Sequence, residues 1–101
     1  MKADVLAALL DLRPELERRG VTGAGLFGSV ARGEQSPQSD IDIFVDLDPQ
    51  STMDLFDFIG VQHLISDHLS PRFQRKIDVI ATEKLRTRVR ASIERDALHA
   101  F

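Results

Sequence analysis

The hydrophobic positions of the chain follow helical spacing at its N-terminus and extended spacing just after it. Apolar residues recur every three or four positions at the start, which predicts a helix over residues 3–19. Pro14 is expected to divide this helix, because proline lacks an amide donor and disfavours helix at the residue before it. Gly20 provides a stop, and residues 21–27 predict a short strand that leaves through a tight turn at Gly28.

The strongest strand signal lies over residues 40–46, after a predicted helical turn at 29–32 and a polar loop at 34–39 that contains Pro37. Its alternation predicts two faces, one with Ile41, Ile43 and Val45 and one with Asp40, Asp42, Phe44 and Asp46. The apolar face predicts packing against a core, so that all three aspartates share the other face with Phe44.

The second half of the chain predicts a helix, a strand and a helix. Ser51 or Thr52 would cap a long helix that runs through Leu69 and is closed by Ser70-Pro71. Residues 76–81 predict a strand, and Thr82 would cap the final helix. Phe56 and Phe58 are expected in the core. The final helix is expected to carry an apolar stripe of Leu85, Val89, Ile93 and Ala97, with Arg86, Arg88, Arg90 and Arg95 around it. This order predicts an α/β (α+β) fold with a small mixed sheet covered by helices.

Composition limits the class of protein. A chain of 101 residues is expected to form one domain, residues 1–101, and 43% hydrophobic residues are ordinary for a globular protein. No apolar run approaches the roughly 20 residues that span a bilayer, so no membrane partner is expected. The absence of cysteine excludes disulfides and thiolate chemistry and suits a cytoplasmic protein.

The net charge of −3 conceals two regions of opposite sign. Residues 33–71 contain eight acidic side chains and neither Lys nor Arg, whereas residues 72–95 contain eight basic side chains and three acidic ones. The acidic region requires counter-charge such as metal ions or a basic neighbour. The basic region can face phosphates, RNA or an acidic protein, or it can be a solvated helix face.

Asp40 and Asp42 point the same way from one strand, roughly 7 Å apart at the backbone, so their carboxylates can converge on divalent ions. Mg²⁺ suits carboxylates and substrate phosphates. In a two-ion site, one ion activates the attacking oxygen and the other steadies the leaving group. Asp78 is the candidate third acid, because it is a lone charge in an apolar strand that can pair beside the strand of Asp42.

A phosphate-binding turn is predicted just before these acids. Gly28 permits close backbone approach, and Ser29 offers an amide and a hydroxyl at the start of a helical turn. Arg32 lies on the same face and can reach a triphosphate as a charged donor. The G-x-G-x-x-G spelling from Gly23 to Gly28 is interpreted as incidental, because Leu26 and Phe27 belong to the strand itself. His63, His68 and His99 show no metal-ligand spacing with the acids.

The segments Gly-Ser-Val-Ala-Arg-Gly (28–33), Ser-Asp-Ile-Asp-Ile (39–43) and Lys-Ile-Asp-Val-Ile (76–80) closely resemble the minimal nucleotidyltransferases (MNT) of the DNA polymerase beta-like superfamily. The resemblance covers essentially the whole chain. It implies that Gly28 and Ser29 hold triphosphate, that Asp40 and Asp42 bind Mg²⁺, and that Asp78 completes the site and can act as base for the acceptor hydroxyl. Members of this family are typically antitoxins encoded beside a helical HEPN ribonuclease toxin, and some transfer AMP from ATP to a tyrosine of that toxin.

The function expected from the resemblance is Mg²⁺-dependent transfer of AMP from ATP to a hydroxyl of a HEPN-type partner. The chain has no tyrosine of its own, so a tyrosine acceptor must lie on another protein. The Arg-rich final helix and Phe101 are the candidate docking surface, and no direct binding of nucleic acid is expected. The alternatives are an antitoxin that inhibits its partner by steric binding alone, and a nucleotidyltransferase for a small molecule or RNA.

Overall fold

The structure is a computed structural model that describes residues 1–84 and 87–101. Leu85 and Arg86 lie outside the described residues, as does the side chain of Val89, so the apolar stripe predicted for the final helix is described only in part. The elements, in chain order, are α1 (Lys2–Asp11), α2 (Arg13–Arg18), β1 (Val21–Phe27), α3 (Gly28–Arg32), β2 (Ile41–Leu47), α4 (Leu55–Phe73), β3 (Ile77–Ala81), a 3₁₀ turn η1 (Thr82–Lys84), α5 (Thr87–Asp96) and β4 (Leu98–His99).

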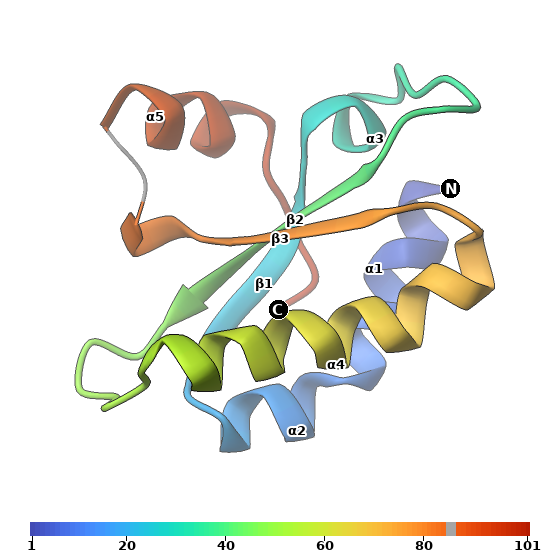
Figure 1. The fold of residues 1–101 in the computed structure, drawn as a ribbon. Coiled ribbons are helices and arrows are strands. Elements are labelled where there is room, and N and C mark those ends of the chain that lie inside the picture. Colours follow the sequence, from blue (N-terminus) through green and yellow to red (C-terminus); the bar gives the residue numbers. More distant parts are fainter. Residues whose placement is uncertain (85–86) are drawn as a thin grey trace.

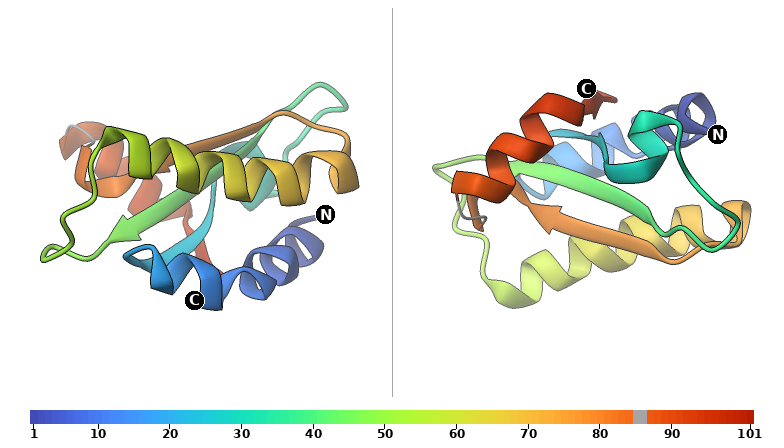
Figure 2. Two further views of the ribbon diagram at one scale, coloured as in Figure 1. Left: turned by 60° about the horizontal axis from the view of Figure 1, so that its bottom comes forward. Right: turned by 90° about the horizontal axis from the view of Figure 1, so that it is seen from above.

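The four strands form one mixed sheet in the order β3-β2-β1-β4. β1 pairs antiparallel with β2 and β4, and β2 pairs parallel with β3. Helices α1, α2 and α4 cover one face of the sheet, and α3 and α5 lie over the other (Figures 1 and 2). The predicted fold class, a small mixed sheet covered by helices, is confirmed.

The core forms between the sheet and the layer of α1, α2 and α4. Ile41, Ile43 and Val45 of β2 are fully buried, as the alternation predicted. They belong to one cluster with the buried side chains of the three helices, Val5, Ala8, Leu9, Leu16, Val61, Ile65 and Leu69. The opposite face of β2 is therefore left for α3, α5 and the aspartates.

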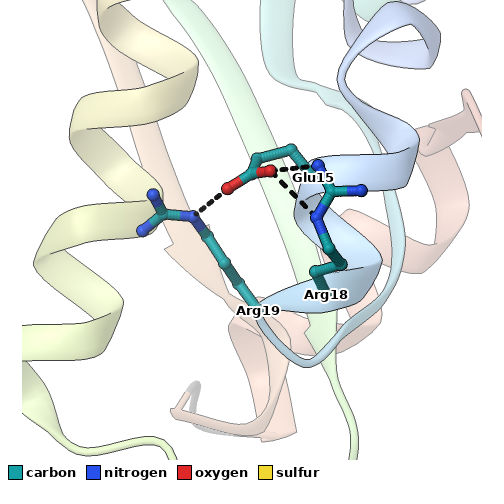
Figure 3. Close-up of polar contacts among 3 residues, drawn as sticks. All are labelled: Glu15, Arg18 and Arg19. Carbon is teal, nitrogen blue, oxygen red and sulfur yellow. Dashed lines mark hydrogen bonds and ion pairs between the residues drawn. The ribbon is translucent and has the colours of Figure 1, made fainter.

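Pro14 divides the N-terminal helix as predicted, and it lies in the first turn of α2, where its missing amide costs no helical hydrogen bond. Glu15 accepts hydrogen bonds from Arg18 and Arg19 on the next turn (Figure 3). These bonds, first from Arg18 and then from Arg19, lower the pKa of Glu15. Gly20 follows with φ of +96°, the left-handed conformation that glycine adopts readily.

The boundaries of α4 differ from the prediction. Neither Ser51 nor Thr52 is the N-cap; Asp54 is, and it forms a capping box in which Asp54 and Asp57 each accept a hydrogen bond from the other's backbone amide. Ser70-Pro71 does not close the helix, because Pro71 lies in the last turn and removes only one hydrogen bond there. Gln74 ends α4 in the left-handed conformation.

The helix also places Phe56 differently from the prediction. The buried residues of α4 are Val61, Ile65 and Leu69, spaced four apart, and Phe56 falls on another face of that periodicity. Its side chain is 81% exposed, so the prediction that Phe56 is a core residue is wrong. Phe58 does pack against the core.

The C-terminal segment contains a strand that the sequence pattern did not reveal. Thr82 begins η1, α5 ends at Asp96, and Leu98–His99 pairs with β1 as β4. Phe101 exchanges backbone hydrogen bonds with Ala24 and packs against the core, with the Arg13 guanidinium 5.1 Å from its ring centre. Phe101 is thus half-buried in the sheet layer, so the expectation that it is an exposed residue is wrong, and its part in a docking surface stays a prediction. No helix among the described residues is long and apolar enough to cross a membrane.

Candidate functional site

Two of the three predicted acids lie directly opposite each other in the sheet. The parallel register of β2 and β3 pairs Asp42 with Asp78, and the antiparallel register of β1 and β2 pairs Asp42 with Phe27. Phe27, Asp42 and Asp78 therefore form one row across three strands, on the face opposite Ile41 and Ile43. This row confirms the predicted pairing of the two strands, which unites acids 36 positions apart in the chain.

The carboxylates are close enough to influence each other. Burial, then the charges of Asp78 and Asp40, raise the pKa of Asp42, and Arg32 offsets part of this rise. The Asp78 side chain is 43% exposed, and Lys76 Nζ lies 3.6 Å from its Oδ1. Within residues 1–84 and 87–101, no three His, Cys, Asp or Glu side chains are already gathered closely enough to hold one metal ion.

The donor chemistry of this row nevertheless fits a divalent cation. Burial and like charges disfavour the ionised form of the Asp42 carboxylate. Carboxylate oxygens are ligands that Mg²⁺ prefers. A cation held by Asp42 and Asp78, with Asp40 beside them, would neutralise this excess negative charge.

Gly28 connects the predicted phosphate turn to Asp42. It begins α3 at φ of +74°, directly after Phe27, the cross-strand neighbour of Asp42. A Cβ at position 28 would lie 2.4 Å from Oδ2 of Asp42, well inside contact distance. Glycine is thus required both by the backbone conformation and by the carboxylate that packs against it, and Ser29 follows in the first turn of α3.

Arg32 lies at the other end of α3 and is engaged in two ion pairs. Its Nε donates to Glu34 at 3.0 Å and its Nη1 donates to Asp96 at 3.1 Å. These hydrogen bonds, first to Glu34 and then to Asp96, raise the pKa of Arg32. The second pair ties α3 to the end of α5, a link between residues 64 positions apart that the sequence did not suggest.

An open cleft of about 470 Å³ lies at the edge of the sheet beside Asp42 and Asp78. Helix α4 contributes Gln62, His63 and Ser66 to its lining. Gln62 is fixed there because its amide donates to the carbonyl of Val79 at 3.0 Å. The sequence did not place these three side chains beside the acids, since only the packing of α4 on β3 brings them there.

The G-x-G-x-x-G pattern of Gly23, Gly25 and Gly28 does not form a dinucleotide-binding motif in this structure. Gly23 and Gly25 lie within β1, and the strand that follows pairs antiparallel with it. The fingerprint requires a turn between a strand and a helix of a parallel βαβ unit. The interpretation of this spelling as incidental is confirmed.

Comparisons with known proteins agree with this geometry. The profile of the nucleotidyltransferase domain family matches residues 9–99. The chain is 32% identical over 80 residues to MJ1379 of Methanocaldococcus jannaschii, named as a candidate protein adenylyltransferase, covering 78% of this chain and 76% of that protein. It is 29% identical over 83 residues to protein adenylyltransferase MntA of Thermococcus cleftensis, covering 82% and 78% of the two chains.

Solved structures show the same fold. A candidate minimal nucleotidyltransferase superposes with a TM-score of 0.72 at 26% identity, covering 97% of this chain and 95% of the other. The MNT antitoxin fold in a complex with the tri-AMPylated HEPN toxin of Shewanella oneidensis gives a TM-score of 0.64 at 16% identity, covering 100% and 72%. The chain therefore belongs to the nucleotidyltransferase domain family, as a minimal nucleotidyltransferase, and the predicted enzyme class is confirmed.

Proposed function

We propose that this minimal nucleotidyltransferase is an antitoxin that transfers AMP from Mg²⁺-bound ATP to a tyrosine hydroxyl of a HEPN ribonuclease toxin. The observation that carries the proposal is the direct pairing of Asp42 with Asp78, with the Gly28 turn packed against Asp42. The relative MntA, which is named a protein adenylyltransferase, supports protein as the acceptor class. The whole of the proposed site lies in a single domain, residues 1–101.

In the proposed reaction, the start of α3 at Gly28 and Ser29 binds the β- and γ-phosphates. Asp40, Asp42 and Asp78 would hold Mg²⁺, two ions in the complete site, which supply charge neutralisation of the phosphates and of the leaving pyrophosphate. Asp78 accepts the proton of the attacking hydroxyl, because its side chain is 43% exposed and borders the open cleft. Catalysis of this kind is mostly positioning and charge stabilisation.

In this proposal Arg32 binds the phosphates of ATP, and to do so it must exchange its ion pairs for phosphate oxygens. Glu34 and Asp96 occupy its guanidinium in the structure. Glu34 is exposed and Asp96 is partly exposed, and ion pairs near the surface are worth little, so a triphosphate can replace the Glu34 pair at small cost and can compete with Asp96. Arg32 would then donate to phosphate oxygens as a charged hydrogen-bond donor.

The partner supplies the acceptor. This chain contains no tyrosine, and the cleft beside Asp78 opens at the sheet edge, where a side chain of a second protein can enter. The exposed arginines of α5, such as Arg88, are the proposed contact with the toxin. Charge complementarity of this type guides partner encounter and specificity more than it adds affinity.

Co-expression with a HEPN toxin, the proposed partner, tests the proposal. Wild-type protein is expected to restore growth, and the double variant Asp40→Asn, Asp42→Asn is expected to leave the toxin active although both proteins still form a complex. If the double variant protects cells as well as wild type does, inhibition is steric and the enzymatic proposal is wrong.

A further inference from the structure

Of the three acids in the proposed site, Asp40 is the one that strand pairing does not place. Asp42 and Asp78 face each other through the register of β2 and β3, whereas β2 begins at Ile41, one residue after Asp40. The loop over residues 33–40 joins α3 to β2 and is neither helix nor strand. The position of Asp40 therefore depends on hydrogen bonds that this loop makes with other segments.

A β-turn over residues 36–39 forms the part of the loop just before Asp40. The Ser39 amide donates to the Ser36 carbonyl at 3.1 Å, and the Ser36 amide donates to Ser39 Oγ at 2.8 Å. Pro37 occupies the second position of the turn, which its fixed φ favours. These bonds fix the four residues relative to one another, and a further contact is needed to fix the turn relative to the sheet.

Arg75 supplies that contact. Its Nη1 donates to the carbonyl of Ser36 at 2.8 Å and to the carbonyl of Ser39 at 2.9 Å. Arg75 is itself anchored to α4, because its carbonyl accepts a hydrogen bond from Ser70 Oγ at 3.0 Å. The side chain of Arg75 thus ties the turn to the end of α4.

The segment that contains Arg75 holds Asp40 from both sides. The Ser39 carbonyl belongs to the planar peptide group that ends at the Asp40 nitrogen, so Arg75 fixes the peptide group before Asp40. The peptide group after Asp40 is fixed by Lys76, whose carbonyl accepts a hydrogen bond from the Ile41 amide at 2.9 Å. Residues 75 and 76 lead directly into β3, so this short segment sets the position of Asp40 relative to Asp78.

We infer that Arg75 is a positioning residue of the metal site, whose bonds to Ser36 and Ser39 hold the Asp40 carboxylate within reach of a divalent ion at Asp42 and Asp78. The inference rests on the proposed function, because it assumes that such an ion binds there. Residues that orient metal ligands typically change metal affinity by about 10–100-fold when they are replaced. Arg75 lies just outside the segments 28–33, 39–43 and 76–80 that carry the family resemblance, so the motifs did not indicate it.

The test is a titration with Mn²⁺ alone, in which electron paramagnetic resonance records the free ion, since Mn²⁺ accepts the same oxygen ligands as Mg²⁺. Arg75→Met keeps an apolar stem without the donors, and it is expected to weaken Mn²⁺ binding by about tenfold or more. Arg75→Lys should recover part of this loss, because both bonds leave from one nitrogen and an ammonium group has three donors. Arg72→Met is the matched control, because Arg72 is exposed in the last turn of α4, and it should bind Mn²⁺ as wild type does.

A second background separates positioning from a general loss of structure. Asp40→Asn alone is expected to weaken Mn²⁺ binding, and Arg75→Met added to it should cause no further loss if Arg75 acts through Asp40. A general loss of structure would instead weaken binding in both backgrounds. If circular dichroism shows that Arg75→Met is unfolded, Arg75→Gln replaces it and is judged by the same criteria.

Four results overturn the inference. They are wild-type Mn²⁺ affinity in Arg75→Met, an equal loss in Arg72→Met, no recovery in Arg75→Lys, and a further loss when Arg75→Met is added to Asp40→Asn. The proposed function fails separately: if Mn²⁺ binding follows the expected pattern but no protein gains AMP, the role of Arg75 stands and the proposed transfer is wrong. If wild type binds no Mn²⁺, both are wrong.

Discussion

Replacing Gly28 by alanine tests the contact between the phosphate turn and Asp42. At φ of +74°, the left-handed backbone costs an alanine about 1–2 kcal/mol. The new Cβ would also lie 2.4 Å from Asp42 Oδ2, so the carboxylate must leave its rotamer, which adds about 0.5–1.5 kcal/mol. Gly28→Ala is therefore expected to lower the free energy of unfolding by about 1.5–3.5 kcal/mol.

Gly33 provides a matched control. Its φ is +73°, almost that of Gly28, but a Cβ there meets nothing within 4 Å. Gly33→Ala should therefore show the backbone cost alone, about 1–2 kcal/mol. Urea unfolding followed by circular dichroism measures both variants, and the extra cost of Gly28→Ala should disappear in an Asp42→Ala background.

Nucleotide binding separates the two glycine variants more sharply. Movement of Asp42 by about 1 Å can cost a hundredfold in a positioned site, so Gly28→Ala should lose calorimetric binding of Mg²⁺-bound AMP-PNP, whereas Gly33→Ala should keep it. Equal stability and equal nucleotide binding for the two variants would refute the argument that Asp42 packs on Gly28.

Further predictions concern charge and capping. Because burial and the charges of Asp78 and Asp40 raise the pKa of Asp42 in the folded protein above its ordinary value of 3.8, its contribution to stability is full below that value and is lost as pH rises through the raised pKa. As pH rises from the ordinary to the raised pKa of Asp42, the melting temperature of wild type should accordingly fall relative to that of Asp42→Asn. If the two proteins show the same pH dependence, burial and like charges do not raise the pKa of Asp42. At neutral pH, Mg²⁺ should raise the melting temperature of wild type but not of the double variant Asp42→Asn, Asp78→Asn, and equal effects would place the ion elsewhere. Asp54→Ala removes the N-cap of α4 and should lower the free energy of unfolding in urea by about 1 kcal/mol, while Thr52→Ala should change it by less than about 0.5 kcal/mol. If Thr52→Ala is the more destabilising of the two, Thr52 is the N-cap, as the sequence predicts.

The sequence was sufficient for those parts of the site that depend on alternation and local spacing. The strand over residues 40–46 and the strand at 76–81 each place an aspartate on a defined face, and parallel pairing then brings Asp42 opposite Asp78. Proline at position 14 likewise has one local consequence, a new helix start. These features required no knowledge of distant contacts.

The features that the sequence did not predict depend on packing between segments far apart. β4 has only two residues, too few for a periodic signal, and it exists because β1 offers an open edge. The start of α4 was misplaced because Ser51, Thr52 and Asp54 are all good caps, and only the reciprocal bond with Asp57 selects Asp54. The Arg32–Asp96 pair requires α3 and α5 to lie side by side over the sheet, and the bonds of Arg75 require the end of α4 to lie beside the loop before Asp40.

Mass spectrometry of the partner protein tests the proposed AMP transfer most directly. The protein is incubated with Mg²⁺, ATP and the proposed HEPN-type partner, and the intact mass of that partner is recorded. The account predicts a gain of one or more AMP units on the toxin with wild type and none with Asp42→Asn. An unchanged toxin mass with wild type and every nucleoside triphosphate, in a mixture where the complex forms, would contradict it.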